Sequence, residues 1–491
     1  MNDLTFITPE INWTVLGMPA FLMIWAMLVL IVDMFTSDRR VLLTLSLIGL
    51  GVTAALGALD YGSTISGFSD MLVFDKFGVL VNWILLAGTA LTLLIAFDYM
   101  PRQNLSQGEF YPLVLFATSG MLFLVQSTDL VTIFIGVETL SIALYVLTGF
   151  AVPQFKSGEA AIKYLLLGGF AAGFLVYGIA LIYGMTGKTN LAQIANELST
   201  WQSTGKALDD PILLAGVGFV LIALGFKVSM FPFHAWTPDV YEGAPTPVTA
   251  YMSVATKGAA FAAMLRFLNV AFPALKPEWQ LLFGLFAAAT MAYGNIVAVA
   301  QTNLKRMLAY SSIAHAGYML LGVLAASEKG ISAFTVYLLA YTLTNLGAFA
   351  VLIALENRGM PVFELSDLRG LGKRSPLLAL AMTVFMFSLA GVPPTAGFAS
   401  KFGIFRAAWD ANLDYLAIIG VVTSVISAFF YLRVIVTMWM RDTEATEPQP
   451  TYATASLSLG VIVAVIGIIA VGILPNIFTD LAKALVLTVA P

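Results

Sequence analysis

The sequence predicts an all-α integral membrane protein with about fourteen transmembrane helices, ten of them in two inverted five-helix repeats. Hydrophobic residues make up 59% of the 491 residues and charged residues only 11%, whereas soluble domains contain about 25% charged residues. Apolar runs recur along the whole chain, and two of them, the seventh and the twelfth, are interrupted at prolines. Charged residues inside these runs recur at a shared spacing, which indicates the repeats.

Fourteen spans are expected because a helix needs about 20 mostly apolar residues to cross a bilayer. The seventh should break at Pro232 and the twelfth at Pro393 and Pro394, since proline removes a backbone donor and clashes with the preceding turn. The first span should be retained, because no Lys or Arg precedes it as in a signal peptide. The predicted spans are residues 14–35, 41–59, 78–98, 111–127, 129–152, 160–185, 211–236, 245–273, 279–301, 305–325, 331–356, 376–409, 414–440 and 454–475.

The connecting loops predict the orientation. Loops after odd-numbered spans contain more Lys and Arg than loops after even-numbered spans. By the positive-inside rule the odd loops are cytoplasmic. We therefore expect a multi-pass protein of the bacterial inner membrane with both termini on the periplasmic side.

Several ionisable residues fall at predicted membrane depth, where such residues are rare and usually functional. Glu138 is the clearest acid within a span. Asp33 and Glu356 lie at span ends, where snorkelling or headgroup contact would account for them. Arg266 and Arg433 are expected to be structural anchors, because arginine stays protonated. The basic residues at this depth are Lys163, Lys227, Lys257, Arg266, Lys401 and Arg433.

The same residues indicate an internal repeat. Three pairs are separated by about 175 residues, and the members of each pair fall five spans apart. Five is odd, so the paired spans run in opposite directions, as in inverted-topology repeats. The pairs are Lys227 with Lys401, Glu138 with His315, and Lys257 with Arg433. The predicted domains are residues 1–110 (spans 1–3), 111–275 (first repeat, spans 4–8), 276–440 (second repeat, spans 9–13) and 441–491 (span 14 and tail).

Glu138 and Lys227 are candidates for an ion pair within the first repeat. Burial favours the neutral form of each group and pairing favours the charged form, so the pair could act as a proton-linked switch. A static salt bridge that fixes helix packing is the alternative.

The remaining candidates differ in how strongly they indicate function. Lys257 lies well inside its span among small residues, and a buried lysine can hold or release a proton. Lys401 follows the predicted break of the twelfth span, which favours a functional role. His315 could bridge a water wire, since histidine titrates near neutrality, or could be a hydrogen-bonded packing residue. His234 is expected to be structural but is kept as a candidate relay, and Lys163 is undecided.

The sequence also excludes several kinds of site. Without cysteine the chain cannot hold a thiolate-ligated iron–sulfur cluster, a disulfide or a catalytic thiol. No nucleotide-binding loop, Ser/His/Asp set, metal cluster or basic nucleic-acid patch is present, and the two histidines do not suit haem. We expect no catalytic residue, cofactor or metal in this chain, with lipid and protons as its partners.

Three stretches resemble the antiporter-like subunits of respiratory complex I, across about residues 75–440. Within that family the chain is most similar to the N branch. The long lateral helix of the L branch has no counterpart after span 14, and Lys401 stands where the M branch typically has a glutamate. The stretches are GFKVSMFPFHAWTPDVYEGAPTPV, QTNLKRMLAYSSIAHAGYMLLG and SLAGVPPTAGFASKF.

The resemblance implies a proton channel driven by quinone reduction elsewhere in the complex. It implies that Glu138 is the fifth-span acid, Lys227 the seventh-span lysine, Lys257 the central relay and Lys401 the exit-side lysine. Flavin, iron–sulfur clusters and quinone would belong to other subunits, and subunits like M and K would be neighbours. A cation/proton antiporter subunit of a sodium/proton exchanger and a non-translocating scaffold are the alternatives.

Overall fold

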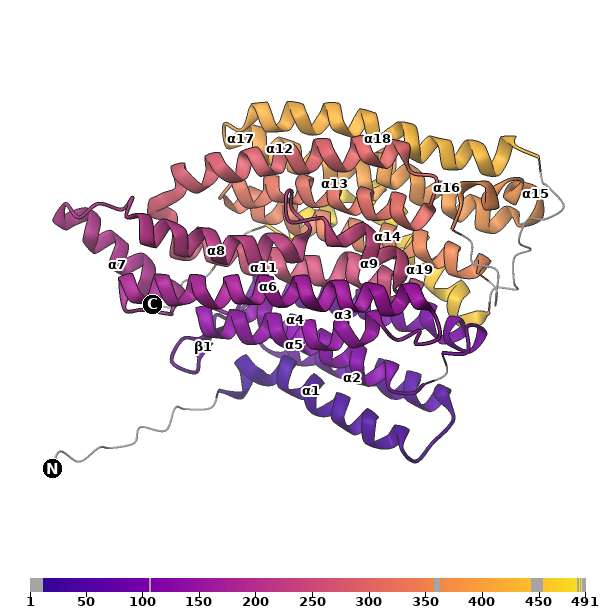
Figure 1. The fold of residues 1–491 in the computed structure, drawn as a ribbon, viewed down its shortest axis with the longest axis horizontal. Coiled ribbons are helices and arrows are strands. Elements are labelled where there is room, and N and C mark those ends of the chain that lie inside the picture. The colour runs from indigo at the N-terminus through magenta and orange to yellow at the C-terminus, as the bar shows by residue number, and fades with distance from the viewer. Residues whose placement is uncertain are drawn as a thin grey trace.

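The computed structural model describes residues 12–105, 107–356, 363–442, 454–483, 485 and 487. Its long helices lie side by side with similar axes (Figure 1). Within the described residues twelve helices are long and apolar enough to cross a membrane, and Phe110–Gln126 and Pro376–Ala390 are shorter apolar helices. The all-α membrane class is confirmed, while the exact count of fourteen spans stays a prediction.

The first part of the bundle is a layer of five helices and one short hairpin. α1 packs on α2 and α4, and α4 packs on α5. Side chains cap several helices; for example, Asp75 accepts a hydrogen bond from the backbone nitrogen of Gly78 at 2.7 Å. The elements are α1 (Trp13–Asp33), α2 (Arg39–Leu59), the antiparallel strands β1 (Ile65–Gly67) and β2 (Leu72–Phe74), α3 (Lys76–Arg102), α4 (Phe110–Gln126) and α5 (Leu130–Thr148).

The next part contains one helix that the sequence did not predict and two π-helical turns. The short helix α7 lies at one end of the bundle (Figure 1). The predicted eighth span, residues 245–273, is helical from Thr246 to Ala271 and contains both π turns. The elements are α6 (Phe155–Thr186), α7 (Leu191–Thr204), α8 (Pro211–Val228), α9 (Trp236–Gly243), α10 (Thr246–Tyr251), the π turn η1 (Met252–Thr256), α11 (Lys257–Arg266), the π turn η2 (Phe267–Ala271) and the 3₁₀ turn η3 (Pro273–Leu275).

The last part covers the opposite side of the bundle. α12 packs on α13 and α18, and α14 packs on α17 and α19. The elements are α12 (Lys276–Ala300), α13 (Leu304–Leu324), α14 (Glu328–Leu355), the 3₁₀ turn η4 (Leu365–Leu368), α15 (Leu371–Arg374), α16 (Pro376–Ala390), α17 (Ala396–Asp410), α18 (Asp414–Met440), α19 (Ala455–Ile473) and α20 (Pro475–Leu481).

Both predicted helix breaks are present. α8 ends at Val228, and the chain leaves the helix through Ser229, which has a left-handed φ of 64°. α16 ends at Ala390, and Gly391 has a φ of 86°. The prolines lie inside these two irregular segments, as expected. Trp236, the predicted end of the seventh span, begins α9 on the far side of the break.

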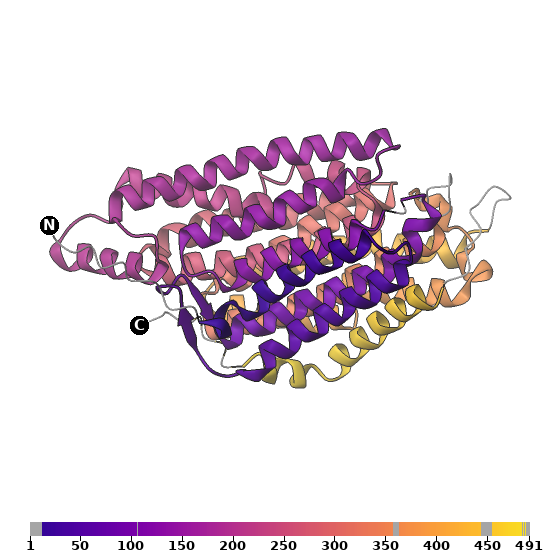
Figure 2. The same ribbon diagram turned by 90° about the horizontal axis from the view of Figure 1, so that it is seen from below.

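Three central segments are almost completely enclosed by the other helices. In the most apolar 18 residues of each segment, 94–100% of the residues are buried inside the protein, whereas in the corresponding stretch of α6 only 28% are buried. Figures 1 and 2 place α1 and α2 on one side of the bundle and α17 and α18 on the other. The central segments are Thr246–Ala271, α13 and α14.

Candidate functional site

Lys227 lies in the last turn of α8, directly before the first helix break. Its side chain is buried, and Nζ donates a hydrogen bond to Ser141 Oγ of α5 at 2.7 Å. The ammonium also lies 5.2 Å from the centre of the Tyr164 ring and 5.6 Å from that of Tyr145. Aromatic faces attract a cation at such distances. One hydroxyl and an aromatic cage therefore hold the charge.

Glu138 does not form the predicted direct ion pair. Among the ion pairs of the described residues, none joins it to Lys227, although Ser141, the partner of Lys227, follows Glu138 by three residues on α5. Glu138 is half-buried and lines a crevice of about 420 Å³ between α5 and α6. Small residues of α6, including Gly173, leave this crevice open. The acid therefore faces outward beside the lysine site.

Lys257 occupies the centre of the bundle and is 0% exposed. It begins α11 immediately after the π turn η1, and such turns are frequent at functional sites. Nζ donates to both oxygens of Ser312 on α13, at 2.6 Å to Oγ and 2.9 Å to the carbonyl. The predicted burial of Lys257 is confirmed.

His315 lies one turn beyond Ser312 on α13 and is held between two tyrosine hydroxyls. Nδ1 is 2.7 Å from Tyr337 of α14, and Nε2 is 3.3 Å from Tyr431 of α18. The Tyr431 hydroxyl is also 2.5 Å from Ser311 Oγ. A histidine with a hydrogen-bond partner on each ring nitrogen can accept a proton on one side and donate on the other. The hydrogen bonds also fit a packing role, so geometry alone leaves both interpretations open.

Lys401 lies in the second turn of α17, after the second break. Nζ donates to the carbonyl of Leu389 at 2.8 Å and to Ser424 Oγ of α18 at 2.8 Å. The ammonium thus lies at the carboxyl end of α16, where the helix dipole favours a cation. A cavity of about 10 Å³, roughly the space of one water, lies between His315 and Ser400.

The two broken spans are not arranged in the same way around their lysines. Lys227 precedes its break, and Lys401 follows its break. Their spacing in the sequence therefore does not make them equivalent positions. The inverted repeat stays a prediction. The two helix breaks support it better than the two lysines do.

Lys163 was expected at membrane depth, but its side chain is 40% exposed. It forms ion pairs with Glu159 at 2.7 Å and with Asp239 of α9 at 2.9 Å. Arg306 completes this cluster by contacting Asp239 and Glu242. Lys163 thus belongs to a partly exposed ion-pair cluster near the start of α6, and its place in the proton path stays a prediction.

His234 lies in the first break and packs between rings. Its ring centre is 4.5 Å from that of Tyr293 and 5.4 Å from that of Phe231. Nδ1 is buried and has no hydrogen-bond partner among the described residues. This arrangement agrees with the expected structural role.

Sequence reasoning missed a buried cation and a buried acid at the turn between α9 and α10. Lys305 Nζ donates to the carbonyl of Ala244 at 2.7 Å, and Glu356 accepts from Thr246 Oγ1 at 2.6 Å. The sequence places Lys305 at the edge of the tenth predicted span and Glu356 at the end of the eleventh, yet both are 2% exposed. The turn between α9 and α10 covers both side chains, and hydropathy at the ends of the spans does not reveal such tertiary contacts.

The buried Arg266 and the half-buried Arg433 both make contacts that suit structural anchors. Arg266 makes a bidentate ion pair with Asp75, with distances of 2.8 and 3.0 Å. Arg433 donates to the carbonyls of Val299 and Gln301 at the end of α12. Within the described residues no group of three or more His, Asp or Glu could hold a metal ion.

Comparisons with known proteins agree with this architecture. Residues 127–427 match the family described as NADH:quinone oxidoreductase/Mrp antiporter, TM. The chain is 50% identical to NADH-quinone oxidoreductase subunit N of Chloroflexus aggregans, over 99% of each chain. It is 46% identical to NADH-quinone oxidoreductase subunit N 2 of Roseiflexus castenholzii, over 98% of each.

Solved structures show the same fold. A chain of respiratory complex I from Thermus thermophilus with bound aureothin is 34% identical, with a TM-score of 0.80 over 95% of this chain and 100% of that one. A chain of the Mrp complex from Dietzia sp. is 24% identical, with a TM-score of 0.82 over 95% and 96%. The second likeness concerns the fold alone. This chain belongs to the NADH:quinone oxidoreductase/Mrp antiporter transmembrane family, in its subunit N group.

Proposed function

We propose that this chain moves protons across the membrane as a subunit of NADH:quinone oxidoreductase, driven by quinone reduction in other subunits. The observation that supports this most is the line of buried proton carriers in the middle of the bundle. Lys227, Lys257, His315 and Lys401 are each at most 4% exposed and each hydrogen-bonded to a hydroxyl. Buried titratable groups in such a line are typical of proton relays.

The line has a polar part and an aromatic part. In the polar part Lys257 donates to Ser312, His315 lies one turn further along α13, and a small cavity lies between His315 and Ser400. Water in that cavity would complete the path to Lys401. Between Lys227 and Lys257 the intervening groups are aromatic rings: Tyr164 stacks on Trp236 with ring centres 4.8 Å apart, and Trp236 meets Tyr241 edge to face at 6.0 Å. Rings cannot relay a proton from face to face. Transfer there therefore requires the rings to move or water to enter, and this segment is the proposed gate.

Glu138 is the proposed link to a neighbouring subunit. An acid facing outward at mid-span is costly in lipid, and its crevice between α5 and α6 is open. A neighbour that covers this face would shield Glu138 from lipid and would change how readily its carboxyl group is protonated. Subunits resembling K and M are the proposed neighbours on the two sides of the chain.

The proposed orientation places both termini on the periplasmic side of the bacterial inner membrane, with the redox cofactors in other subunits. The chain contains no cysteine, so single introduced cysteines can report sidedness without background. Arg39→Cys should react with a membrane-impermeant thiol reagent from the cytoplasmic side, and Lys188→Cys from the periplasmic side. The reverse pattern would contradict this orientation.

The competing proposal is that the chain is a subunit of a sodium/proton exchanger, because its fold is also that of a chain of the Mrp complex. The complex that contains this chain should be purified and reconstituted in vesicles. We expect NADH oxidation with bound flavin, and NADH-driven acidification that does not depend on sodium. Sodium-dependent proton exchange without NADH oxidation would overturn the proposal in favour of the exchanger.

A further inference from the structure

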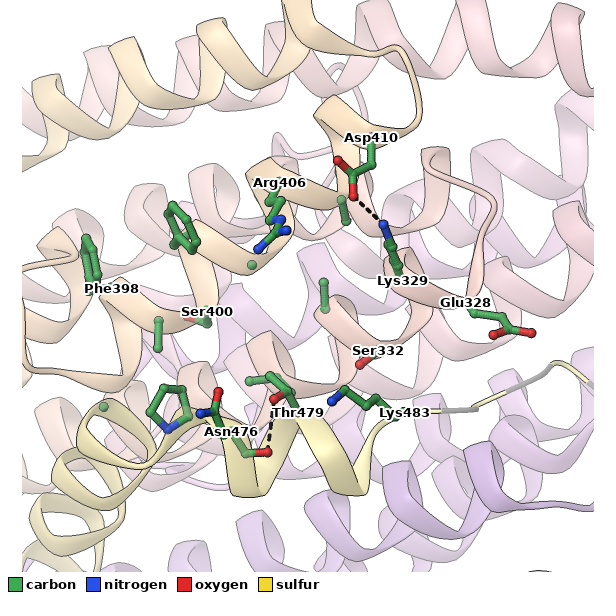
Figure 3. A pocket seen from close by; sticks show the side chains of 18 residues that line it. Glu328, Lys329, Ser332, Phe398, Ser400, Arg406, Asp410, Asn476, Thr479 and Lys483 are labelled. Carbon is green, nitrogen blue, oxygen red and sulfur yellow. Dashed lines mark hydrogen bonds and ion pairs between the residues drawn. The ribbon is translucent and has the colours of Figure 1, made fainter.

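A groove of about 580 Å³ opens at the end of the bundle where α14 begins and α17 ends (Figure 3). The first turns of α14, the length of α17 and the α19–α20 junction form its walls. It is lined by both aromatic and basic side chains. A volume of a few hundred to about 1,000 Å³ is typical of a ligand site.

One stripe of α17 changes from apolar to basic along the groove. Phe398, Phe402 and Arg406 are spaced four residues apart, so they lie on one face of the helix. The two rings are stacked with centres 6.2 Å apart, and they are 42% and 58% exposed. α17 begins at the mid-span break and ends at Asp410. The rings therefore lie deep, and Arg406 lies about 12 Å nearer the end of the bundle than Phe398.

The basic groups of the groove are not equally satisfied. Lys329 forms an ion pair with Asp410 at 2.7 Å, and Lys483 contacts Asp480. Asp410, the partner of Lys329, is close enough to interact with the charge of Arg406. Among the described residues, however, no hydrogen bond or ion pair involves the guanidinium of Arg406, and the carboxylate of Glu328 points away from it (Figure 3). A guanidinium without hydrogen-bond partners presents a planar fork that suits phosphate. Asn476 and Thr479 add polar groups from α20.

We propose that this groove binds an anionic phospholipid. Its phosphate contacts Arg406 and Lys483, and one acyl chain lies along Phe398 and Phe402. The order of groups matches a lipid, with apolar contacts deep in the membrane and cations at its edge. A soluble anion would leave the exposed rings uncovered, and a zwitterionic lipid would gain less from the unpaired guanidinium.

Gly403 offers a way to block the groove without altering its charges. It lines the groove between Phe402 and Arg406, and a Cβ built there meets no atom within 4 Å. A leucine at this position can therefore extend into the open space while α17 stays helical. The effect of Gly403→Leu therefore shows what filling the groove does to lipid binding when no charge is lost.

The test uses the purified complex in lipid nanodiscs with photoactivatable phosphatidylglycerol or photoactivatable phosphatidylcholine. Labelled peptides are mapped by mass spectrometry. Phosphatidylglycerol should label α17 and α20 more than phosphatidylcholine does. Arg406→Gln should lower this labelling about fivefold, because each basic group near the membrane surface is worth about 1 kcal/mol to an anionic lipid.

Three further variants make the test decisive. Adding Lys483→Gln should lower the labelling further, and Gly403→Leu should lower it with all charges retained. Lys188→Gln, an exposed lysine on the same predicted side, should leave it unchanged. Equal labelling by both lipids, or unchanged labelling in Arg406→Gln/Lys483→Gln, would overturn the proposal. Cross-linking of the groove to a neighbouring subunit in place of lipid would also overturn it.

Discussion

Replacement of Ser312 by alanine tests the central lysine without removing it. Ser312 Oγ is one of two acceptors of the Lys257 ammonium, at 2.6 Å, and the other is the Ser312 carbonyl at 2.9 Å. A hydrogen bond to a charged group contributes about 1.5–3 kcal/mol, and each 1.4 kcal/mol is about a factor of ten. The protonated state of Lys257 should therefore be populated about 10- to 100-fold less, and proton pumping should fall accordingly.

The assay is NADH-driven quenching of a pH-gradient dye in membrane vesicles, normalised to assembled complex. Ser46→Ala is the matched control, because Ser46 is equally buried but its Oγ donates only to Leu42 O within α2. We expect Ser46→Ala to pump normally and Ser312→Ala to pump at least about tenfold more slowly. Pumping within twofold of the unmodified complex in Ser312→Ala would refute the reasoning.

Three further predictions concern other parts of the molecule. Glu138→Gln should strongly lower NADH-driven quenching while Glu138→Asp keeps part of it, with both complexes assembled; normal quenching in Glu138→Gln would leave Glu138 a packing role. Thr246→Val removes the hydroxyl that donates to buried Glu356, so it should lower stability by about 1–3 kcal/mol, measured as a lower Tm of the complex. Arg266→Met leaves Asp75 buried without its partner and should cost about 3–5 kcal/mol, whereas adding Asp75→Asn, which removes the charge and keeps an oxygen to accept from Gly78, should recover much of the assembled complex; no recovery would contradict a simple buried pair.

The features predicted correctly from the sequence depend on local chemistry. A proline cannot continue a helix, so Pro232 and Pro393 marked the two breaks wherever the neighbouring helices lay. A lysine many residues inside an apolar run has no short route to water, so the burial of Lys257 and Lys401 also followed from the sequence alone.

The features that the sequence could not predict depend on which segments meet in space. Glu138 and Lys227 look like a pair along the chain, but the order of residues on α5 places Ser141 against the lysine. Lys305 and Glu356 lie at predicted span ends, and nothing in the sequence shows that the α9–α10 turn covers them.

The tyrosines around His315 illustrate a further limit. The sequence contains 17 tyrosines, and nothing in their spacing distinguishes Tyr337 and Tyr431 from those that only pack. Tyr337 comes from the next helix, α14, and Tyr431 from α18, 116 residues beyond His315; only the tertiary fold brings both hydroxyls to the imidazole.

Proton pumping by Lys257 variants tests the central claim most directly. Lys257→Ala removes the proton carrier, and Lys257→Arg keeps a charge that does not release its proton. With assembly of the complex confirmed for each, both variants should lose most NADH-driven acidification, and arginine should restore little of it. Acidification by Lys257→Ala vesicles at the unmodified rate would contradict the proposed proton path through the centre of the bundle.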